Sequence, residues 1–204
     1  MDRPLRNGNS IDNVEVRHWL VDRERSQRRV VPEPGVPVVT ISREYGAQGA
    51  AIGRIVAERM QFRFWERELV GEHDDVRALA TAATALATKG GAVMVGRGIG
   101  FLLSPSRALR VRVVCPLEQR ISGLMERQGL THDTARATIA YADRARRVFV
   151  HDLYGRDIDD VSGYDLWVST GSLTLDAAAA VIISAYRYRY GERVMRQVGA
   201  QLGT

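Results

Sequence analysis

The sequence has a single cysteine, Cys115, among its 204 residues. A disulfide within the chain is therefore excluded, which is typical of a reducing compartment and predicts a cytoplasmic location. Cys115 ends an apolar run, and this position predicts a thiol buried in the core. The histidines lack the mutual spacing of metal ligands, so no structural zinc site is expected; they are His18, His73, His132 and His151.

The sequence also lacks any run of about 18 apolar residues, so no membrane-spanning segment is expected. Residues 1–29 are polar and charged, without the apolar stretch of a secretory signal. With 45% hydrophobic and 26% charged residues, the chain has a globular composition, and its length suits one domain. The net charge of +5 indicates either polyanionic partners (nucleotides, phosphates or nucleic acid) or a solvated basic surface.

Residues 1–36 differ from the rest of the chain. A polar start is followed by a segment in which Val14, Trp19 and Leu20 stand among charged residues, as in an amphipathic helix. Prolines 32, 34 and 37 then interrupt the chain. We expect an N-terminal extension that docks on the core or on a partner subunit, and a homodimer formed through it is one prediction.

From residue 37 onward, strand patterns alternate with helix patterns. We expect strands at 37–42, 62–65, 92–96, 110–115 and 164–170, and helices at 48–60, 66–89, 117–128, 132–152 and 174–190. This alternation predicts an α/β fold in which a five-stranded parallel sheet is covered by helices on both faces. The main domain would span 37–190, leaving 191–204 as a C-terminal tail. Such sheets bind ligands at the carboxyl ends of their strands.

A glycine-containing turn joins the first strand to the first helix, and this geometry presents backbone N–H groups to a phosphate. Laid on the G-x-x-x-x-G-K-[ST] pattern, Arg43 stands at the first glycine, Gly49 at the lysine and Ala50 at the hydroxyl residue. Arg43 could replace the lost charge or pair with Glu44 or Glu66, and a tight turn without a ligand is the alternative reading. The residues expected to bind nucleotide phosphates are Ser42, Arg43, Gly46, Ala47, Gln48, Gly49, Ala50 and Ala51.

Short segments in the same order resemble the cytidylate-kinase-like family over roughly residues 38–185. They are residues 39–46 with Gly49, then 64–70, 95–98, 116–120, 143–146 and 164–170. The resemblance implies a three-layer P-loop NTPase fold with a mobile helical lid at about 129–160. It also implies ATP as the donor, with Mg²⁺ carried by the nucleotide. Many members lack the loop lysine and keep Ser-Arg-x-Tyr-Gly, but this chain has Ala50-Ala51 where the family often has a polar pair.

The resemblance also implies an acceptor site. Arg97, between two glycines after the third strand, would bind the acceptor's phosphate through paired hydrogen bonds. A structural pairing of Arg97 with an acidic residue is the alternative. The related kinases carry an aspartate beside this arginine, whereas Gly98 stands here. Glu66 would orient the acceptor or simply stabilise a helix start, and Asp143 would lie on the acceptor side and orient an arginine.

Arginines of the long basic helix correspond to the lid of the resembled kinases. Arg144, Arg146 and Arg147 would close over the triphosphate together with the catalytic Arg43; Arg144 and Arg147 share one helix face, and Arg146 lies to the side. A solvated basic helix is the alternative. No metal site formed by protein ligands alone is expected, although Glu44 is a candidate to reach Mg²⁺ on the nucleotide.

Three functions follow from these observations. The first is a phosphotransferase that moves the ATP γ-phosphoryl to a nucleoside monophosphate or a similar small acceptor. The second is a nucleotide-binding regulatory protein with impaired catalysis, favoured by the missing lysine, the missing hydroxyls and the missing aspartate. The third is a nucleic-acid-associated protein, to which residues 186–190 would contribute alternating Tyr and Arg. On a helix these side chains point in different directions, so nucleic acid is not expected as a partner.

Overall fold

The structure, a computed structural model, describes residues 36–66 and 76–201. A parallel sheet of five strands has the order β2-β3-β1-β4-β5. Its strands are β1 (Val38–Arg43), β2 (Arg63–Trp65), β3 (Ala92–Val95), β4 (Ala108–Val114) and β5 (Leu166–Ser169). The predicted five-stranded parallel sheet is therefore confirmed. All carboxyl ends lie along one edge, where the central strand β1 ends between β3 and β4.

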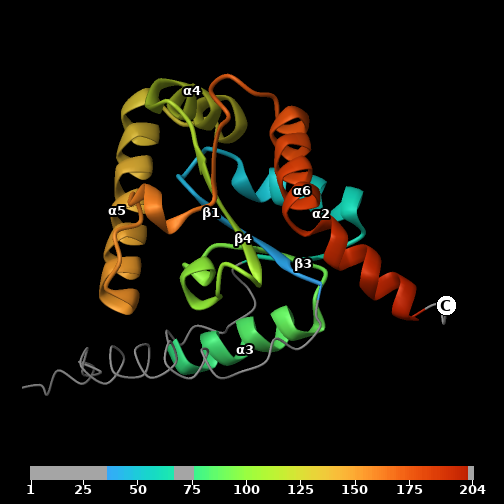
Figure 1. Ribbon diagram of the computed structural model, residues 1–204. Coiled ribbons are helices and arrows are strands. Elements are labelled where there is room, and N and C mark those ends of the chain that lie inside the picture. The colour runs from blue at the N-terminus through green and yellow to red at the C-terminus, as the bar shows by residue number, and fades with distance from the viewer. Residues whose placement is uncertain (1–35, 67–75, 202–204) are drawn as a thin grey trace, which may run out of the picture.

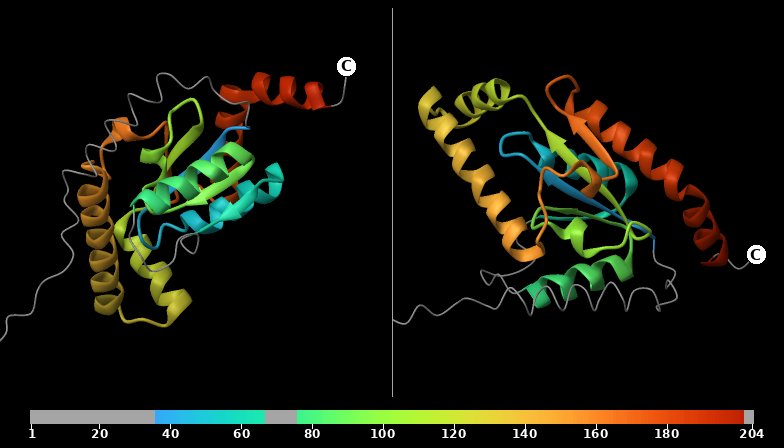
Figure 2. Two further views of the ribbon diagram at one scale, coloured as in Figure 1. Left: turned by 90° about the horizontal axis from the view of Figure 1, so that it is seen from below. Right: turned by 60° about the vertical axis from the view of Figure 1, so that its left-hand side comes forward.

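Helices cover both faces of the sheet (Figures 1 and 2). The helices are α2 (Gly49–Met60), α3 (Val76–Lys89), α4 (Leu117–Gln128), α5 (His132–Tyr154) and α6 (Leu175–Gln201), with 3₁₀ turns η2 (Ile99–Leu102) and η3 (Val161–Gly163). Helices α2 and α6 pack together on one face, while α3 and η2 lie on the other. This arrangement gives the three layers expected from the sequence.

Alternation along β1 assigns its side chains to two separate cores. Val39 and Ile41 pack with α2 and α6, whereas Val38 points to the core that contains η2 and the end of α5. Burial of each such aliphatic side chain contributes about 1.5–3 kcal/mol. The same alternation sends the last two residues of β1, Ser42 and Arg43, to opposite faces.

Helices α4 and α5 form a pair with its own small apolar cluster. Ile121, Leu124 and Ile139 are buried there, and Tyr45 from the loop after β1 packs against them. Thr131 caps α5 by accepting a hydrogen bond from the Thr134 backbone N–H, as the sequence predicts. The pair therefore rests on the loop at the carboxyl end of the sheet.

Two expectations are wrong in detail. The last helix does not end at residue 190 but continues to Gln201, so the proposed tail 191–204 is largely helical. The helix continues through Gly191, because an interior glycine costs a helix only about 1 kcal/mol. Cys115 is partly buried rather than inside the core, since it follows the end of β4 where α4 begins.

Some expectations fall on residues outside the described part. The extension 1–36 lies there except for Val36, and so do residues 67–75 of the helix expected at 66–89. Within the described residues, no helix combines the length and the apolar character that crossing a membrane requires.

Candidate functional site

The loop between β1 and α2, residues 44–48, ends at the N-terminus of a helix. Gly46 and Gln48 both adopt left-handed conformations, with φ of 85° and 58°. The helix α2 follows at Gly49, and the N–H groups of a helix's first turn have no partner within the helix. For a non-glycine residue such as Gln48 this backbone costs about 1–2 kcal/mol. Strain of this kind is typical of functional sites.

Charged side chains with little exposure hold this loop in place. The Glu44 carboxylate accepts the backbone N–H of Cys115 at 2.8 Å and lies 3.7 Å from the Arg120 guanidinium. Arg120, on α4, has a side chain only 9% exposed and donates to the Tyr45 carbonyl at 3.3 Å. Its Nη1 also donates to Asp143 of α5 at 2.6 Å. The Glu44 carboxylate is therefore engaged in fixing the loop.

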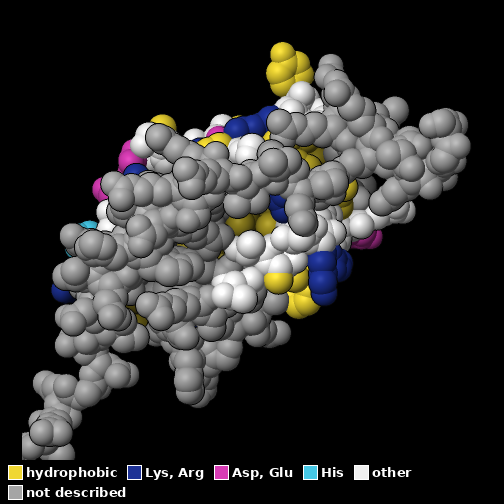
Figure 3. Space-filling view, turned by 60° about the horizontal axis from the view of Figure 1, so that its bottom comes forward, with side chains coloured by type: hydrophobic (Ala, Val, Ile, Leu, Met, Phe, Trp, Pro, Cys, Tyr) yellow, Lys and Arg dark blue, Asp and Glu magenta, His cyan; other side chains and the backbone are white. Residues whose placement is uncertain are grey.

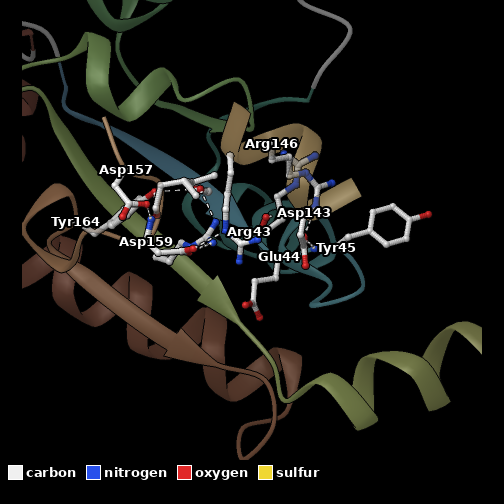
Figure 4. A network of polar contacts seen from close by, with 12 residues as sticks. Arg43, Glu44, Tyr45, Asp143, Arg146, Asp157, Asp159 and Tyr164 are labelled. Atoms are coloured by element: carbon white, nitrogen blue, oxygen red, sulfur yellow. Dashed lines mark hydrogen bonds and ion pairs between the residues drawn. The ribbon is translucent and has the colours of Figure 1, made fainter. Parts of the chain in front are cut away.

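Asp143 connects α5 directly to the loop. One of its carboxylate oxygens accepts the Tyr45 backbone N–H at 2.7 Å, while the other accepts from Arg120. Figure 4 shows Glu44, Tyr45, Asp143 and Arg146 gathered around this connection. We call Glu44, Arg120 and Asp143 the loop bracket.

Of the three arginines expected in a lid, Arg146 lies on the loop. Its Nη1 is 3.5 Å from the Arg43 carbonyl and 3.5 Å from Asp143, and its guanidinium stands 5.3 Å from the Tyr45 ring centre. Arg147 instead donates to Asp159 at 2.9 Å. Arg144 is exposed, and no ion pair joins it to a described residue. Of these three arginines, Arg146 is therefore the one that contacts the loop, whereas Arg147 pairs with Asp159.

The Arg43 side chain runs from the phosphate loop to the end of β3. Its stem lies against Gly49, where an added Cβ would stand 2.6 Å from the Arg43 Cβ. Its guanidinium passes over Gly96, where an added Cβ would stand 2.3 Å from Nη1. The far end lies 3.8 Å from Glu66, whose other oxygen accepts from Arg54 at 2.8 Å. The guanidinium of Arg43 therefore lies between the loop and the turn that contains Arg97.

Arg97 occupies a turn with three consecutive left-handed residues, Gly96, Arg97 and Gly98. Hydrogen bonding of the Gly96 N–H to the Ile41 carbonyl, at 2.9 Å, places this turn beside the end of β1. The Tyr154 hydroxyl donates to the Arg97 carbonyl at 2.6 Å. Burial raises the pKa of this hydroxyl, and the charge of Arg97 partly opposes the shift.

Helix α5 also contacts the side chain of Arg97. The guanidinium lies 5.3 Å from the ring centre of Phe149, a distance at which cation and ring attract each other. The Arg97 turn is thus held by α5, the same helix that carries Arg146.

A second polar network was not foreseen from the sequence. Arg112 of β4, only 3% exposed, donates to the Ser42 hydroxyl at 3.0 Å and to Asp159 at 2.7 Å. Ser42 also lies 3.3 Å from the Tyr164 hydroxyl, which donates to the Ile158 carbonyl at 2.9 Å. The Ser42 side chain therefore faces the segment before β5 and not the start of α2. A small pocket lies beside this network; it is lined by Thr40, Ser42, Gly96, Gly98, Phe101 and Tyr164 among others.

Asp159 joins this network to α5, because it accepts from both Arg112 and Arg147. Burial would raise the pKa of the Asp159 carboxyl, but hydrogen bonds and charges from Arg147 and Arg112 outweigh that effect and hold the pKa below its usual value. Figure 4 shows Asp157, Asp159 and Tyr164 on the opposite side of Arg43 from Asp143.

The residues at this edge suit a phosphate chain better than a metal ion. Backbone N–H groups, Arg43 and Arg146 converge there, and Ala50 and Ala51 contribute no hydroxyl. Among the described residues, no group of three His, Cys, Asp or Glu side chains could hold a metal. Magnesium at this site would thus be held mainly through phosphate oxygens.

One helical stripe in the sequence could have identified the important α5 residues. Ala135, Ile139, Val150 and Tyr154 are its buried positions. Asp143 and Arg146 continue the same stripe at spacings of three or four, so they had to face the domain. No comparable signal links Arg112 to Asp159, because the contact depends on the shape of the segment between α5 and β5.

Known proteins with similar sequences include cytidylate kinases. The model of the "Cytidylate kinase-like family" matches residues 38–75 and 72–172. A cytidylate kinase from Pyrococcus horikoshii is 28% identical over 99 residues, which are 48% of this chain and 51% of that protein. A uronate isomerase from Corynebacterium glutamicum is 32% identical over 109 residues, 51% of this chain but 20% of that protein. The chain thus spans about half the length of the cytidylate kinase.

Solved structures show the same fold. An uncharacterized protein from Eubacterium ventriosum superposes with a TM-score of 0.65 at 22% identity, covering 74% of this chain and 98% of that one. A gluconokinase from Sinorhizobium meliloti gives a TM-score of 0.51 at 14% identity, covering 80% and 97%. The fold is that of the P-loop kinases, and the chain belongs to the cytidylate kinase-like family.

Proposed function

We propose that this protein is a phosphotransferase that moves the γ-phosphoryl group of ATP to a small acceptor such as a nucleoside monophosphate. The observation that carries the proposal is the position of Arg146. This α5 side chain contacts the loop before α2, in which Gly46 and Gln48 have left-handed backbone conformations. A phosphate-binding turn with a cation held over it is what phosphoryl transfer requires, because catalysis there consists mainly of positioning and charge stabilisation.

Each group has a role in this proposal. The N–H groups of Gly46 and of residues 48–51 bind the donor phosphates, since the Ala47 N–H already donates to the Glu44 carbonyl at 3.3 Å. Arg43 and Arg146 stabilise negative charge on the transferring group. Arg97 binds the acceptor's anionic group at the neighbouring strand end. An acceptor oxygen forms the new bond to the γ-phosphorus while the bond to the β–γ bridging oxygen breaks, and ADP leaves with that electron pair. A cytoplasmic location belongs to the same proposal.

A second candidate is a nucleotide-binding regulatory protein without turnover. The loop lacks a lysine and a hydroxyl, Gly98 stands where the related kinases carry an aspartate, and Glu44 is engaged by Arg120 and the Cys115 N–H. Loss of one well-placed stabilising group costs about 3–4 kcal/mol in comparable sites. This candidate predicts binding of nucleotides without transfer to any acceptor.

A nucleic-acid-binding role has less support. Tyr186 and Tyr190 are only 2% and 3% exposed and belong to the core, so the alternating Tyr and Arg residues form no continuous stacking platform. Figure 3 shows one face, and the Lys and Arg side chains visible among its described atoms lie in separate small groups.

A thermal-shift titration with ATP, ADP, CMP and their Mg²⁺ complexes tests the proposal. Ligand at a hundredfold excess over its dissociation constant stabilises the native state by about 2.7 kcal/mol, which raises the melting temperature by about 5–10 °C. Arg146→Ala should abolish most of this shift. Arg136→Ala is the matched control, because Arg136 lies on the same helix and, among the described residues, pairs only with the exposed Glu118 at 3.8 Å. No shift with any nucleotide at millimolar concentration would refute nucleotide binding.

Transfer is then measured as ADP release with a panel of acceptors. Nucleoside monophosphates come first, and sugar acids follow because a relative named uronate isomerase matches half of this chain. Nucleotide binding without ADP release for any acceptor would favour the regulatory candidate.

A further inference from the structure

The two ends of the phosphate loop face each other at close range. Position 43 ends β1 and position 49 begins α2, and these are the first glycine and the lysine of the usual P-loop pattern. A Cβ added to Gly49 would stand 2.6 Å from the Arg43 Cβ and 3.0 Å from its Cγ. Carbon atoms do not approach that closely without a backbone shift, because the contact involves the base of the Arg43 side chain and not its flexible end.

The backbone at Gly49 does not itself require glycine. Gly49 is the first residue of α2, and its φ is not in the positive range that favours glycine. Apart from Arg43, the nearest obstacle to a side chain is the Ile41 methyl group at 3.4 Å, which is a tight but ordinary contact. The stem of Arg43 is therefore the reason that position 49 has no side chain.

From this contact we infer that the loop cation has been relocated and not lost, with Arg43 taking the place of the P-loop lysine. Only one of the two facing positions can carry a side chain. The usual pattern places glycine on the strand side and the cation on the helix side, and this chain has the opposite arrangement. The inference rests on the proposed function, which assigns charge stabilisation to Arg43, and adds the steric exchange that moves the loop cation from position 49 to position 43.

The path of Arg43 agrees with this role. The Arg43 side chain passes Gly49 at its stem and Gly96 at its guanidinium. The guanidinium therefore lies at the edge of the sheet where the phosphate loop after β1 is next to the Arg97 turn after β3. A P-loop lysine reaches the β- and γ-phosphates from the helix side. Lys89, the only lysine in the sequence, lies at the end of α3, so no other lysine of the chain can supply the loop charge.

Four proteins test the exchange: the wild type, Gly49→Lys, Arg43→Gly, and the double variant that restores the usual pattern. Gly49→Lys alone should lower the melting temperature by about 5 °C, because its Cβ overpacks against Arg43. The double variant should recover that loss, since its position 43 has no Cβ. A double variant as unstable as Gly49→Lys would overturn the steric argument, whether or not any protein binds nucleotide.

Binding of ADP and ATP, measured by calorimetry, tests the role of the charge. Arg43→Gly should weaken ATP binding about tenfold or more, and the double variant should restore it. Arg43→Lys retains the charge in the wild-type arrangement and should keep most of the affinity, which separates loss of charge from loosening of the strand. Arg54→Ala is the control, because Arg54 shares the Glu66 carboxylate with Arg43 but lies 61% exposed on α2.

The outcomes separate the two proposals. If the wild type binds ATP and Arg43→Gly binds equally well, Arg43 is not the loop cation and the inference fails while the proposed function stands. If the wild type binds no nucleotide, the proposed function fails and with it the role of the charge, whereas the steric exchange is still decided by the melting temperatures.

Discussion

Removing the Asp159 carboxylate should destabilise the fold more than removing the buried Arg112 that pairs with it. Arg112 is 3% exposed, and its charge is offset by Asp159 at 2.7 Å and by the Ser42 hydroxyl at 3.0 Å. Its Nε has no hydrogen-bond partner among the described atoms, so part of its desolvation is uncompensated. Asp159→Ala would leave this cation buried without a counter-charge.

The magnitudes follow from this asymmetry. Removing one partner of a fully buried ion pair costs about 3–5 kcal/mol. Asp159 is 38% exposed, and Ser42 still accepts from Arg112, so we expect a smaller loss of about 2 kcal/mol for Asp159→Ala. Arg112→Met fills a similar volume and leaves Asp159 paired with Arg147, so we expect a loss of about 1 kcal/mol or less.

Urea unfolding at pH 7 measures both losses. With a slope of about 2 kcal/mol per molar urea, Asp159→Ala should lower the midpoint by about 1 M and Arg112→Met by half of that or less. Arg147→Ala is the control; it removes the 57% exposed partner of Asp159 and should cost at most about 1 kcal/mol. A larger loss for Arg112→Met than for Asp159→Ala would refute the reasoning, because it would show that the buried charge is itself stabilising.

Three further predictions concern the loop bracket, acid stability and a helix end. Asp143→Asn should speed amide exchange in residues 43–50 about tenfold, because the charged acceptor of the Tyr45 N–H is lost. Asp165→Asn is the control and should leave this exchange unchanged; the Asp165 carboxylate is similarly buried and also accepts hydrogen bonds from a backbone N–H and a guanidinium. Faster exchange in both variants would indicate general loosening instead. The pKa values of Asp159 and Asp165 are held below their usual range by neighbouring arginines, against the effect of burial. Their stabilisation is therefore complete above the unfolded pKa near 4 and is lost as pH falls through the lower folded values. In an acid unfolding titration, Asp159→Asn should flatten this part of the curve, and an unchanged curve would contradict the assignment. Gln61→Gly should stabilise the protein by about 0.5–1 kcal/mol, because Gln61 ends α2 with a φ of 55° that favours glycine; a lower melting temperature would show that the side chain makes a compensating contact.

Much of the fold could be predicted because local pattern and tertiary structure agree. The apolar strand at β1, the proline before α4 and the threonine before α5 all act within a few residues of their own position. The end of α6 is not fixed by the local sequence, because Gly191 lowers the helix propensity while its neighbours favour a helix, and local rules do not say which effect is larger.

The candidate site was only half visible in the sequence. The glycines of the loop and Arg43 are recognisable from their local spacing. The hydrogen bond from the Tyr45 N–H to Asp143, however, joins residues 98 positions apart, and only packing brings them together. The sequence predicts that Arg146 lies beside the helix face shared by Arg144 and Arg147. Helical spacing shows which arginines are neighbours, but it does not show which face of the helix packs against the domain. That choice is made by the apolar contacts of α5 with α4.

The contact between positions 43 and 49 also bears on how such loops evolve. A single replacement at position 49 would bring two side chains into one space, and a single replacement at position 43 would leave the loop with no cation of its own. Each route between the two loop types therefore passes through a variant that is overpacked or uncharged. A lineage that has fixed arginine on the strand side is held there, and searches that require the lysine will overlook its members although their loops carry the same charge.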